Sequence, residues 1–273
     1  MIELTAYGEE KLLPAGKINR EDRIFLHEQK DVEDNQGQRF GLRETEEGLY
    51  IKPLNYVGVI QLSELKINIR PRFDGGFSRL IPLLSFCREM DYSFTLRNTG
   101  ITTGELALEE VVVRLLLEEV EEILNRGAFK EYRTYERNLN VMRGRVDLRK
   151  QLTRNQLRGD RLYCRYDELD TDIIENRILL RALNIARRLH AGRDVTRRAD
   201  RYYHRLARFC EEYRGKGMLE LEYNRLNYFY RQAHFYCRLL LENTGTADIY
   251  RGQDSGYYTL LLDMNELLEE FVS

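Results

Sequence analysis

The spacing of hydrophobic and polar positions changes once along the chain, near residue 75. Before that point, short apolar or alternating runs are separated by glycine and polar turns, as is typical of β-strands. These runs occupy residues 23–27, 48–52, 57–61 and 66–69. A proline and a glycine pair then interrupt the pattern within residues 70–76. We therefore predict a β-rich N-terminal domain in residues 1–75, built as a small antiparallel sheet or barrel.

Beyond this boundary, apolar residues recur every three or four positions, which predicts helices. The helical pattern covers residues 78–90, 106–125, 171–190, 196–214 and 225–242. Residues 130–152 instead alternate around Arg143-Gly144-Arg145, which predicts a β-hairpin at about 130–150. The sequence thus predicts an α+β fold, in which a small β-rich N-terminal domain precedes a mainly helical domain at 76–260 with an inserted β-hairpin.

Composition narrows the class of protein. The 273 residues are 42% hydrophobic and 32% charged, which is typical of a globular chain with room for two modest domains. No apolar run is long enough to span a bilayer and the N-terminus lacks a signal pattern, so we expect a cytoplasmic protein without a membrane partner. The four cysteines are widely spaced without a CxxC pair, which indicates free thiols and no metal site.

The formal net charge is −2, yet the positive charge is mostly arginine and much of it is clustered. In the segment Arg143-Gly144-Arg145-Val146-Asp147, a glycine that permits a tight turn separates two rigid guanidinium groups. Such a turn can bind phosphates or carboxylates of a partner. The alternative is that these arginines pair within the chain. The acidic residues available for that pairing are Asp147, Asp167, Glu168 and Asp170.

An acidic run directly precedes the helix predicted at 171–190. Its members are Asp167, Glu168, Asp170 and Asp172. They could suggest a divalent metal site, but carboxylates at a helix start are favoured by the unpaired amides and the helix dipole, so we interpret the run as capping and solvated. Asn176 and Arg177 follow within the helix. We predict that they are buried hydrogen-bonding residues that lock this helix to the hairpin.

Residues 187–208 form a second arginine-rich segment. Its candidate DNA contacts are Arg197, Arg198, Arg201 and Arg205, with Tyr202 and Tyr203 interleaved. Arginine and aromatic side chains together can bind phosphates and stack on bases. Interspersed acids dilute this patch, and arginine stems often cover apolar surface. A solvated or partner-facing helix and a DNA-binding helix both fit the pattern.

The sequence lacks the motifs of several classes of enzyme. There is no Gly-x-x-x-x-Gly-Lys-Ser/Thr loop, so we do not expect this chain to bind or hydrolyse a nucleotide through a P-loop. The Glu-x-Lys tripeptides at 28–30 and 64–66 resemble the end of a PD-(D/E)xK nuclease motif, but no Pro-Asp pair precedes them. We do not expect either tripeptide to be catalytic.

Four segments, taken in order, resemble the McrC family of McrBC-type modification-dependent restriction systems. They are VGVIQLSELKINIRPRF from Val57, NLNVMRGRVDLRKQL from Asn138, YCRYDELDTDIIENRILLRAL from Tyr163 and LDMNELLEEFV from Leu262. The resemblance implies a McrB-like AAA+ GTPase hexamer as partner, into whose channel the subunit inserts part of its N-terminal region and whose GTP hydrolysis it stimulates. It thereby favours a partner-binding role for Arg143, Gly144, Arg145 and Asp147, with DNA present in the assembled complex.

The resemblance also implies a role in cleaving 5-methylcytosine-type DNA. In the family, the last segment resembles the first helix of a PD-(D/E)xK nuclease fold, so residues 261–273 are expected to form that helix, with Glu270 at the place of its acid. The downstream acids and lysine are not in this sequence, so Mg²⁺ is expected for a nuclease domain outside it, and we expect no cleavage by this chain alone. The alternative function is a stand-alone DNA-binding module that uses the arginine-rich helix.

Overall fold

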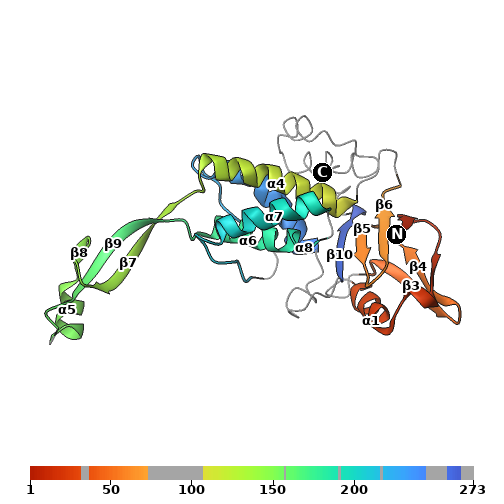
Figure 1. The fold of residues 1–273 in the computed structure, drawn as a ribbon, viewed down its shortest axis with the longest axis horizontal. Coiled ribbons are helices and arrows are strands. Elements are labelled where there is room, and N and C mark those ends of the chain that lie inside the picture. Colours follow the sequence, from red (N-terminus) through yellow and green to blue (C-terminus); the bar gives the residue numbers. More distant parts are fainter. Residues whose placement is uncertain are drawn as a thin grey trace.

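The computed structural model describes residues 1–31, 37–72, 107–156, 158–189, 192–215, 218–243 and 257–265. The molecule is elongated, with β-sheets at one end, a helical body in the middle and a thin arm at the other end (Figure 1). This arrangement confirms the predicted α+β class, because a β-rich N-terminal region is followed by a mainly helical region with an inserted antiparallel hairpin.

In the part of the chain that the structure describes, the N-terminal region contributes strands to two sheets. The first has the order β1 (Ile2–Thr5), β6 (Lys66–Arg70), β5 (Tyr56–Gln61) and β10 (Tyr258–Asp263), and only β1 pairs in parallel. The second is antiparallel, with the order β2 (Lys11–Pro14), β4 (Gly48–Pro53) and β3 (Phe40–Thr45). The strands predicted at 48–52, 57–61 and 66–69 are confirmed as β4, β5 and β6. A short 3₁₀ helix, η1 (Ala15–Lys17), follows β2.

The strand predicted at 23–27 is wrong, because these residues lie in helix α1 (Arg20–Gln29). Asn19 and Asp22 form a reciprocal capping box at its start, in which each side chain accepts a hydrogen bond from the other residue's backbone amide. Phe25 and Leu26 are buried beneath the helix. The capping box at Asn19 therefore starts a helix in a segment whose alternating pattern indicates a strand.

Strand β10 returns the chain to the first sheet after the helical body. It pairs antiparallel with β5 over six residues, from Tyr258 opposite Gln61 to Asp263 opposite Tyr56. Residues 261–263, expected to begin a helix, are thus strand. The reason is that residues 258–262 are all buried, and a continuous short buried run suits a strand with both faces covered. Residues 266–273, including Glu270, lie outside the described residues.

Among the described residues, four helices form the body, and they pack against one another as α6 on α7 and α8, and α4 on α7 and α8. They are α4 (Leu108–Arg126), α6 (Ile174–Ala186), α7 (Arg193–Leu206) and α8 (Arg231–Asn243), with a 3₁₀ turn η3 (Tyr228–Tyr230) before α8. The pattern-based helices at 106–125, 171–190, 196–214 and 225–242 are confirmed with shifted ends, and that at 78–90 lies outside the described residues. None of the described helices is both long and apolar enough to cross a membrane.

The arm consists of β7 (Glu131–Leu139), β9 (Leu162–Asp170), the two-residue strand β8 (Arg145–Val146) and the short helix α5 (Leu148–Arg154). β7 and β9 pair antiparallel over nine residues, and β8 lies on the other side of β9. The hairpin is therefore longer than the one predicted at 130–150. Residues 140–156 and 158–161 lie at its far end, where Figure 1 places α5.

The hydrophobic core runs from the first sheet into the helical body. Strand residues such as Val59, Ile67 and Leu260 are fully buried, as are Val112 and Leu116 of α4. Among the described residues, none between 130 and 173 belongs to this core. The arm is thus an appendage whose packing is separate from that of the body.

Candidate partner-binding arm

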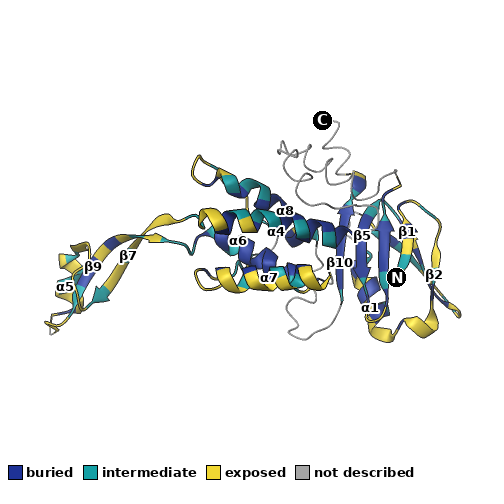
Figure 2. Cartoon of the chain, turned by 45° about the horizontal axis from the view of Figure 1, so that its top comes forward, coloured by how far each residue is buried: buried dark blue, intermediate teal, exposed yellow. Residues whose placement is uncertain are grey.

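The arm is open to solvent along most of its length (Figure 2). β7 and α5 have no buried residue. Burial in the described part of the arm is confined to Asn155 in the segment after α5 and to Tyr163, Cys164 and Tyr166 on the central strand β9. The arm therefore presents most of its side chains to solvent.

The far end of the arm is strongly basic. Residues 138–165 contain seven arginines, one lysine and two aspartates, so eight positive and two negative charges give a formal net charge of +6. The whole chain has a net charge of −2, so the remaining residues carry −8. This separation of charge along a long axis favours the approach of an acidic surface to the arm.

Gly144 allows the chain to cross over β9 at the arm's end. Its φ of +64° lies in the left-handed region. A Cβ added here would lie 2.5 Å from the carbonyl oxygen of Arg165 and 2.6 Å from the Cβ of Tyr166. Both the backbone angle and the close approach therefore require glycine at this position, between Arg143 and Arg145.

The two arginines have different surroundings. The Arg143 guanidinium lies 4.6 Å from the ring centroid of Tyr166 and donates to Glu168 at 2.9 Å, and its side chain remains 54% exposed. The hydrogen bond to Glu168 raises the pKa of Arg143 above its ordinary value. Arg145 is exposed, has no ion pair among the described residues and lies opposite Arg165 in the ladder. The predicted internal pairing therefore exists for Arg143, with Glu168 as its partner.

Asp147 has a local task. Its carboxylate accepts a hydrogen bond from the backbone amide of Lys150 at 3.0 Å and so caps the start of α5. Its own amide donates to the carbonyl of Tyr163 at 2.8 Å, which ties the cap to β9. Asp147 thus fixes α5 on the arm and does not neutralise the neighbouring arginines.

The acidic run at the base of the arm does not cap α6, so the capping interpretation is wrong. Asp167, Glu168 and Asp170 lie in β9, and α6 begins after Ile173 without a side-chain cap. Their partners come from across the sheet, where Thr134 donates to Asp167 at 2.6 Å. Within the described residues, no group of three His, Cys, Asp or Glu side chains is placed to hold a metal ion.

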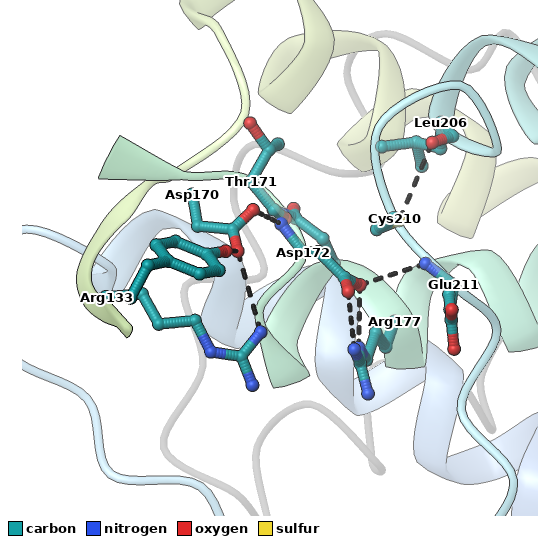
Figure 3. A network of polar contacts seen from close by, with 10 residues as sticks. Arg133, Asp170, Thr171, Asp172, Arg177, Leu206, Cys210 and Glu211 are labelled. Carbon is teal, nitrogen blue, oxygen red and sulfur yellow. Dashed lines mark hydrogen bonds and ion pairs between the residues drawn. The ribbon is translucent and has the colours of Figure 1, made fainter. Parts of the chain in front are cut away.

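Asp170 and Asp172 connect the base of the arm to the body, as Figure 3 shows. Asp170 accepts from the Tyr135 hydroxyl and the backbone amide of Asp172, and Arg133 approaches it at 3.5 Å. Asp172 receives both Nε and Nη2 of Arg177, at 2.7 and 2.5 Å. The Tyr135 hydroxyl lowers the pKa of Asp170, and Arg177 lowers the pKa of Asp172, so both stay ionised.

Asn176 joins the two chain segments that enter and leave the arm at its base. It is fully buried, and its amide donates to the carbonyl of Phe129 at 3.0 Å and to that of Thr171 at 2.8 Å. Tyr230 donates to the Asn176 carbonyl at 2.7 Å and accepts from the amide of Phe129 at 2.8 Å. Phe129 precedes β7 and Thr171 follows β9, so α6 and the η3 turn before α8 hold both strands of the arm. Sequence reasoning missed Tyr230, because nothing local marks it.

The four candidate DNA-binding arginines of α7 fall into two pairs. Arg198 donates to Glu118 and Glu121 of α4, both at 2.9 Å, and Arg205 donates to the carbonyl of Leu124 at 3.1 Å. Arg197 and Arg201 are exposed. Half of the predicted patch is therefore engaged in joining α7 to α4.

The fold and the arm together define an elongated α+β protein whose helical body presents a basic hairpin arm. The chain belongs to the McrBC 5-methylcytosine restriction system component family, whose family model matches residues 51–273. No functionally curated sequence matches it.

The fold is similar to that of chains in solved structures. A chain in the cryo-EM structure of the Thermococcus gammatolerans McrBC complex aligns with a TM-score of 0.67 and 18% sequence identity, over 99% of this chain and 85% of that chain. A chain in the refined half-complex from a tetradecameric assembly of Thermococcus gammatolerans McrB AAA+ hexamers with bound McrC aligns with a TM-score of 0.65 and 19% identity, over 99% of this chain and 68% of that chain.

Proposed function

We propose that this protein is a McrC-like subunit of a 5-methylcytosine-type restriction system, and that its arm docks on a GTP-hydrolysing AAA+ hexamer. The observation that carries the proposal is the arm itself, which projects from the body and ends in a region of net charge +6. Membership of the McrBC family and the shared fold with a complex of McrB AAA+ hexamers and bound McrC support it.

In this proposal, the arm enters the channel of the ring and presents Arg143 and Arg145 to the ring subunits. Fixed cationic groups lower the barrier to phosphoryl transfer when they stabilise developing charge or order the groups that do so. The stacking of Arg143 on Tyr166 and its bond to Glu168 hold one guanidinium in place before docking. GTP is bound by the partner, since the sequence contains no P-loop.

The base of the arm then couples the ring to the rest of the complex. A force on β7 or β9 reaches α6 through Asn176 and through the Asp172 to Arg177 pair. From α6 it passes into a core that is continuous with the N-terminal sheet and β10. We propose that this path links GTP-driven movement on DNA to Mg²⁺-dependent DNA cleavage in the assembled system.

The test is the GTP hydrolysis rate of the AAA+ protein of the same system, measured with and without this chain. We expect the wild-type chain to raise the rate, and Arg143→Glu with Arg145→Glu to abolish the increase. Arg197→Glu with Arg201→Glu is the matched control, because it makes the same charge change at exposed arginines of α7. Stimulation that survives reversal of the arm arginines would rule out their assigned role.

The DNA-binding alternative depends on α7 and is tested with the same two variants. Arg198 and Arg205 contact α4, which leaves Arg197 and Arg201 to meet a phosphate backbone. These contacts favour the arm as the functional element. If the chain alone binds duplex DNA and Arg197→Glu with Arg201→Glu removes that binding while the arm variant does not, the alternative is correct.

A further inference from the structure

The basic end of the arm also exposes four large aliphatic side chains. Val141 and Met142 lie in the loop after β7 and are 77% and 61% exposed. Leu148 and Leu152 of α5 are 72% and 64% exposed. Among the described residues of 138–165, the large hydrophobic side chains that are exposed are aliphatic and none is aromatic. Electrostatic attraction to a partner would not by itself require these exposed apolar side chains.

Helix α5 exposes its apolar face to solvent, unlike an ordinary surface helix. Such a helix packs its apolar stripe inwards and exposes its polar face. In α5 the polar side chain of Gln151 faces the arm, since it donates to the carbonyl of Arg161 at 2.9 Å and accepts from the amide of Tyr163 at 2.7 Å. Leu148 and Leu152 are four residues apart, so they share one face, and that face is left uncovered.

The chemistry of this surface fits a protein better than a nucleic acid. Single-stranded nucleic acids are bound by cations together with exposed aromatic rings on which bases stack. The tyrosines at this end are buried on β9, and Tyr163 lies beneath Lys150 and Arg154, at 5.2 and 5.3 Å. Exposed leucines amid cations instead complement an apolar recess bordered by acidic side chains.

We propose that Leu148 and Leu152 form an apolar docking face that binds an acidic-rimmed apolar recess on the subunits of the AAA+ ring. This inference rests on the proposed docking of the arm and assigns separate tasks to its parts. The two leucines supply affinity through burial of apolar surface. Arg143 and Arg145 supply the stimulation of hydrolysis once the arm is bound.

The test is a titration of the ring protein with Leu148→Gln and Leu152→Gln combined, read out as GTP hydrolysis. The change leaves the charge of the arm intact, and α5 has no buried residue whose loss would unfold it. We expect the half-saturating concentration to rise by at least about tenfold, because burying two leucines stabilises a complex by more than the free energy of one decade in Kd. We expect the maximal rate to stay unchanged.

Two comparisons make the result specific. Leu219→Gln with Leu226→Gln alters two exposed leucines of the body, 46% and 67% exposed, and should titrate like the wild type. Arg143→Glu with Arg145→Glu should lower the maximal rate. Circular dichroism and thermal unfolding of each variant establish that it is folded.

The other outcomes overturn the inference in distinguishable ways. A wild-type half-saturating concentration in the leucine variant refutes the docking face but leaves ring docking standing. A wild-type chain that neither binds nor stimulates the ring refutes the proposed function as well. If the leucine change instead abolishes self-association in sedimentation, or binding to DNA, the face belongs to a second copy or to nucleic acid.

Discussion

Arg143 and Arg145 are two residues apart but are prepared for different contacts. Arg143 is held over Tyr166 and paired with Glu168, so it loses little conformational freedom when it meets a partner. Arg145 faces Arg165 across the ladder, where two like charges repel. We therefore expect an acidic group of a partner to be favoured between Arg145 and Arg165, where it would relieve that repulsion.

Glu119 on α4 is a residue whose ionisation opposes folding. Burial, followed by the nearby charges of Glu122 and Glu118, raises its pKa to about 7. The folded chain therefore binds more protons than the unfolded chain between pH 4.5 and 7, and this contribution to stability is lost as pH rises through that range. We expect Glu119→Gln to be more stable than the wild type at pH 8, by on the order of 2–3 kcal/mol, because the pKa of Glu119 rises from 4.5 to about 7.

Urea unfolding at pH 5 and pH 8 measures this difference. The advantage of Glu119→Gln should shrink towards pH 5, where the wild-type carboxyl is protonated in the folded state. Glu64→Gln makes the same chemical change at an exposed glutamate and should stay within ~0.5 kcal/mol of the wild type at both pH values. An advantage that does not depend on pH would contradict the assigned cause.

At the scale of elements, Gly144 determines whether the end of the arm assembles. In Gly144→Ala, the left-handed backbone costs about 1 kcal/mol, and the new Cβ meets the Arg165 carbonyl oxygen. We expect β8 and α5 to detach from β9 while the body stays folded. Hydrogen exchange should show lost protection at the amides of Asp147 and Tyr163, which hold this end together.

Gly159→Ala is the control for that experiment, since it lies in the same arm and an added Cβ there has no neighbour within 4 Å. It should exchange like the wild type. Equal protection in Gly144→Ala and Gly159→Ala would show that the crossing over β9 tolerates a side chain.

The elements also show what sequence patterns can predict. The helices of the body follow from a 3.6-residue period, which burial on one face imposes locally. The sequence pattern does not predict β9 and β10, because a strand is defined by its partner, and Tyr258 pairs with Gln61 far away along the chain. The sequence pattern places the acidic residues of β9 at a helix start for the same reason, since Thr134 and Arg143 reach them from other parts of the arm.

Part of the candidate site can likewise be predicted from the sequence. Arg143-Gly144-Arg145 could be recognised because a glycine between two arginines signals a turn whatever its partners are. The outward face of α5 cannot be predicted in this way. The spacing of Leu148 and Leu152 is typical of a buried pair, and only the contacts of Gln151 show that the opposite side of the helix packs on the arm. Patterns predict which residues share a face, but only the tertiary contacts decide whether that face is covered.

At the scale of the whole molecule, stability and the proposed docking are located in different parts of the structure. The continuous core lies in the body and the sheets, and none of its described residues comes from 130–173. The basic end of the arm lies outside that core, and the rest of the chain carries −8. The arm should therefore be removable without loss of the fold.

Replacing residues 136–165 by Asn-Gly tests this separation directly. Tyr135 and Tyr166 are opposite each other in the ladder, so a two-residue turn can join them, and the contacts of Asp170, Asp172 and Asn176 at the base are retained. We expect calorimetry to show one cooperative transition with a midpoint within about 4 °C of the wild type, and the GTPase assay to show no stimulation at any concentration. A shortened chain that unfolds would make the arm part of the folding unit. One that stays folded and still stimulates the ring would place the docking surface on the body, because the Arg143 and Arg145 guanidiniums and the α5 leucines would all have been removed.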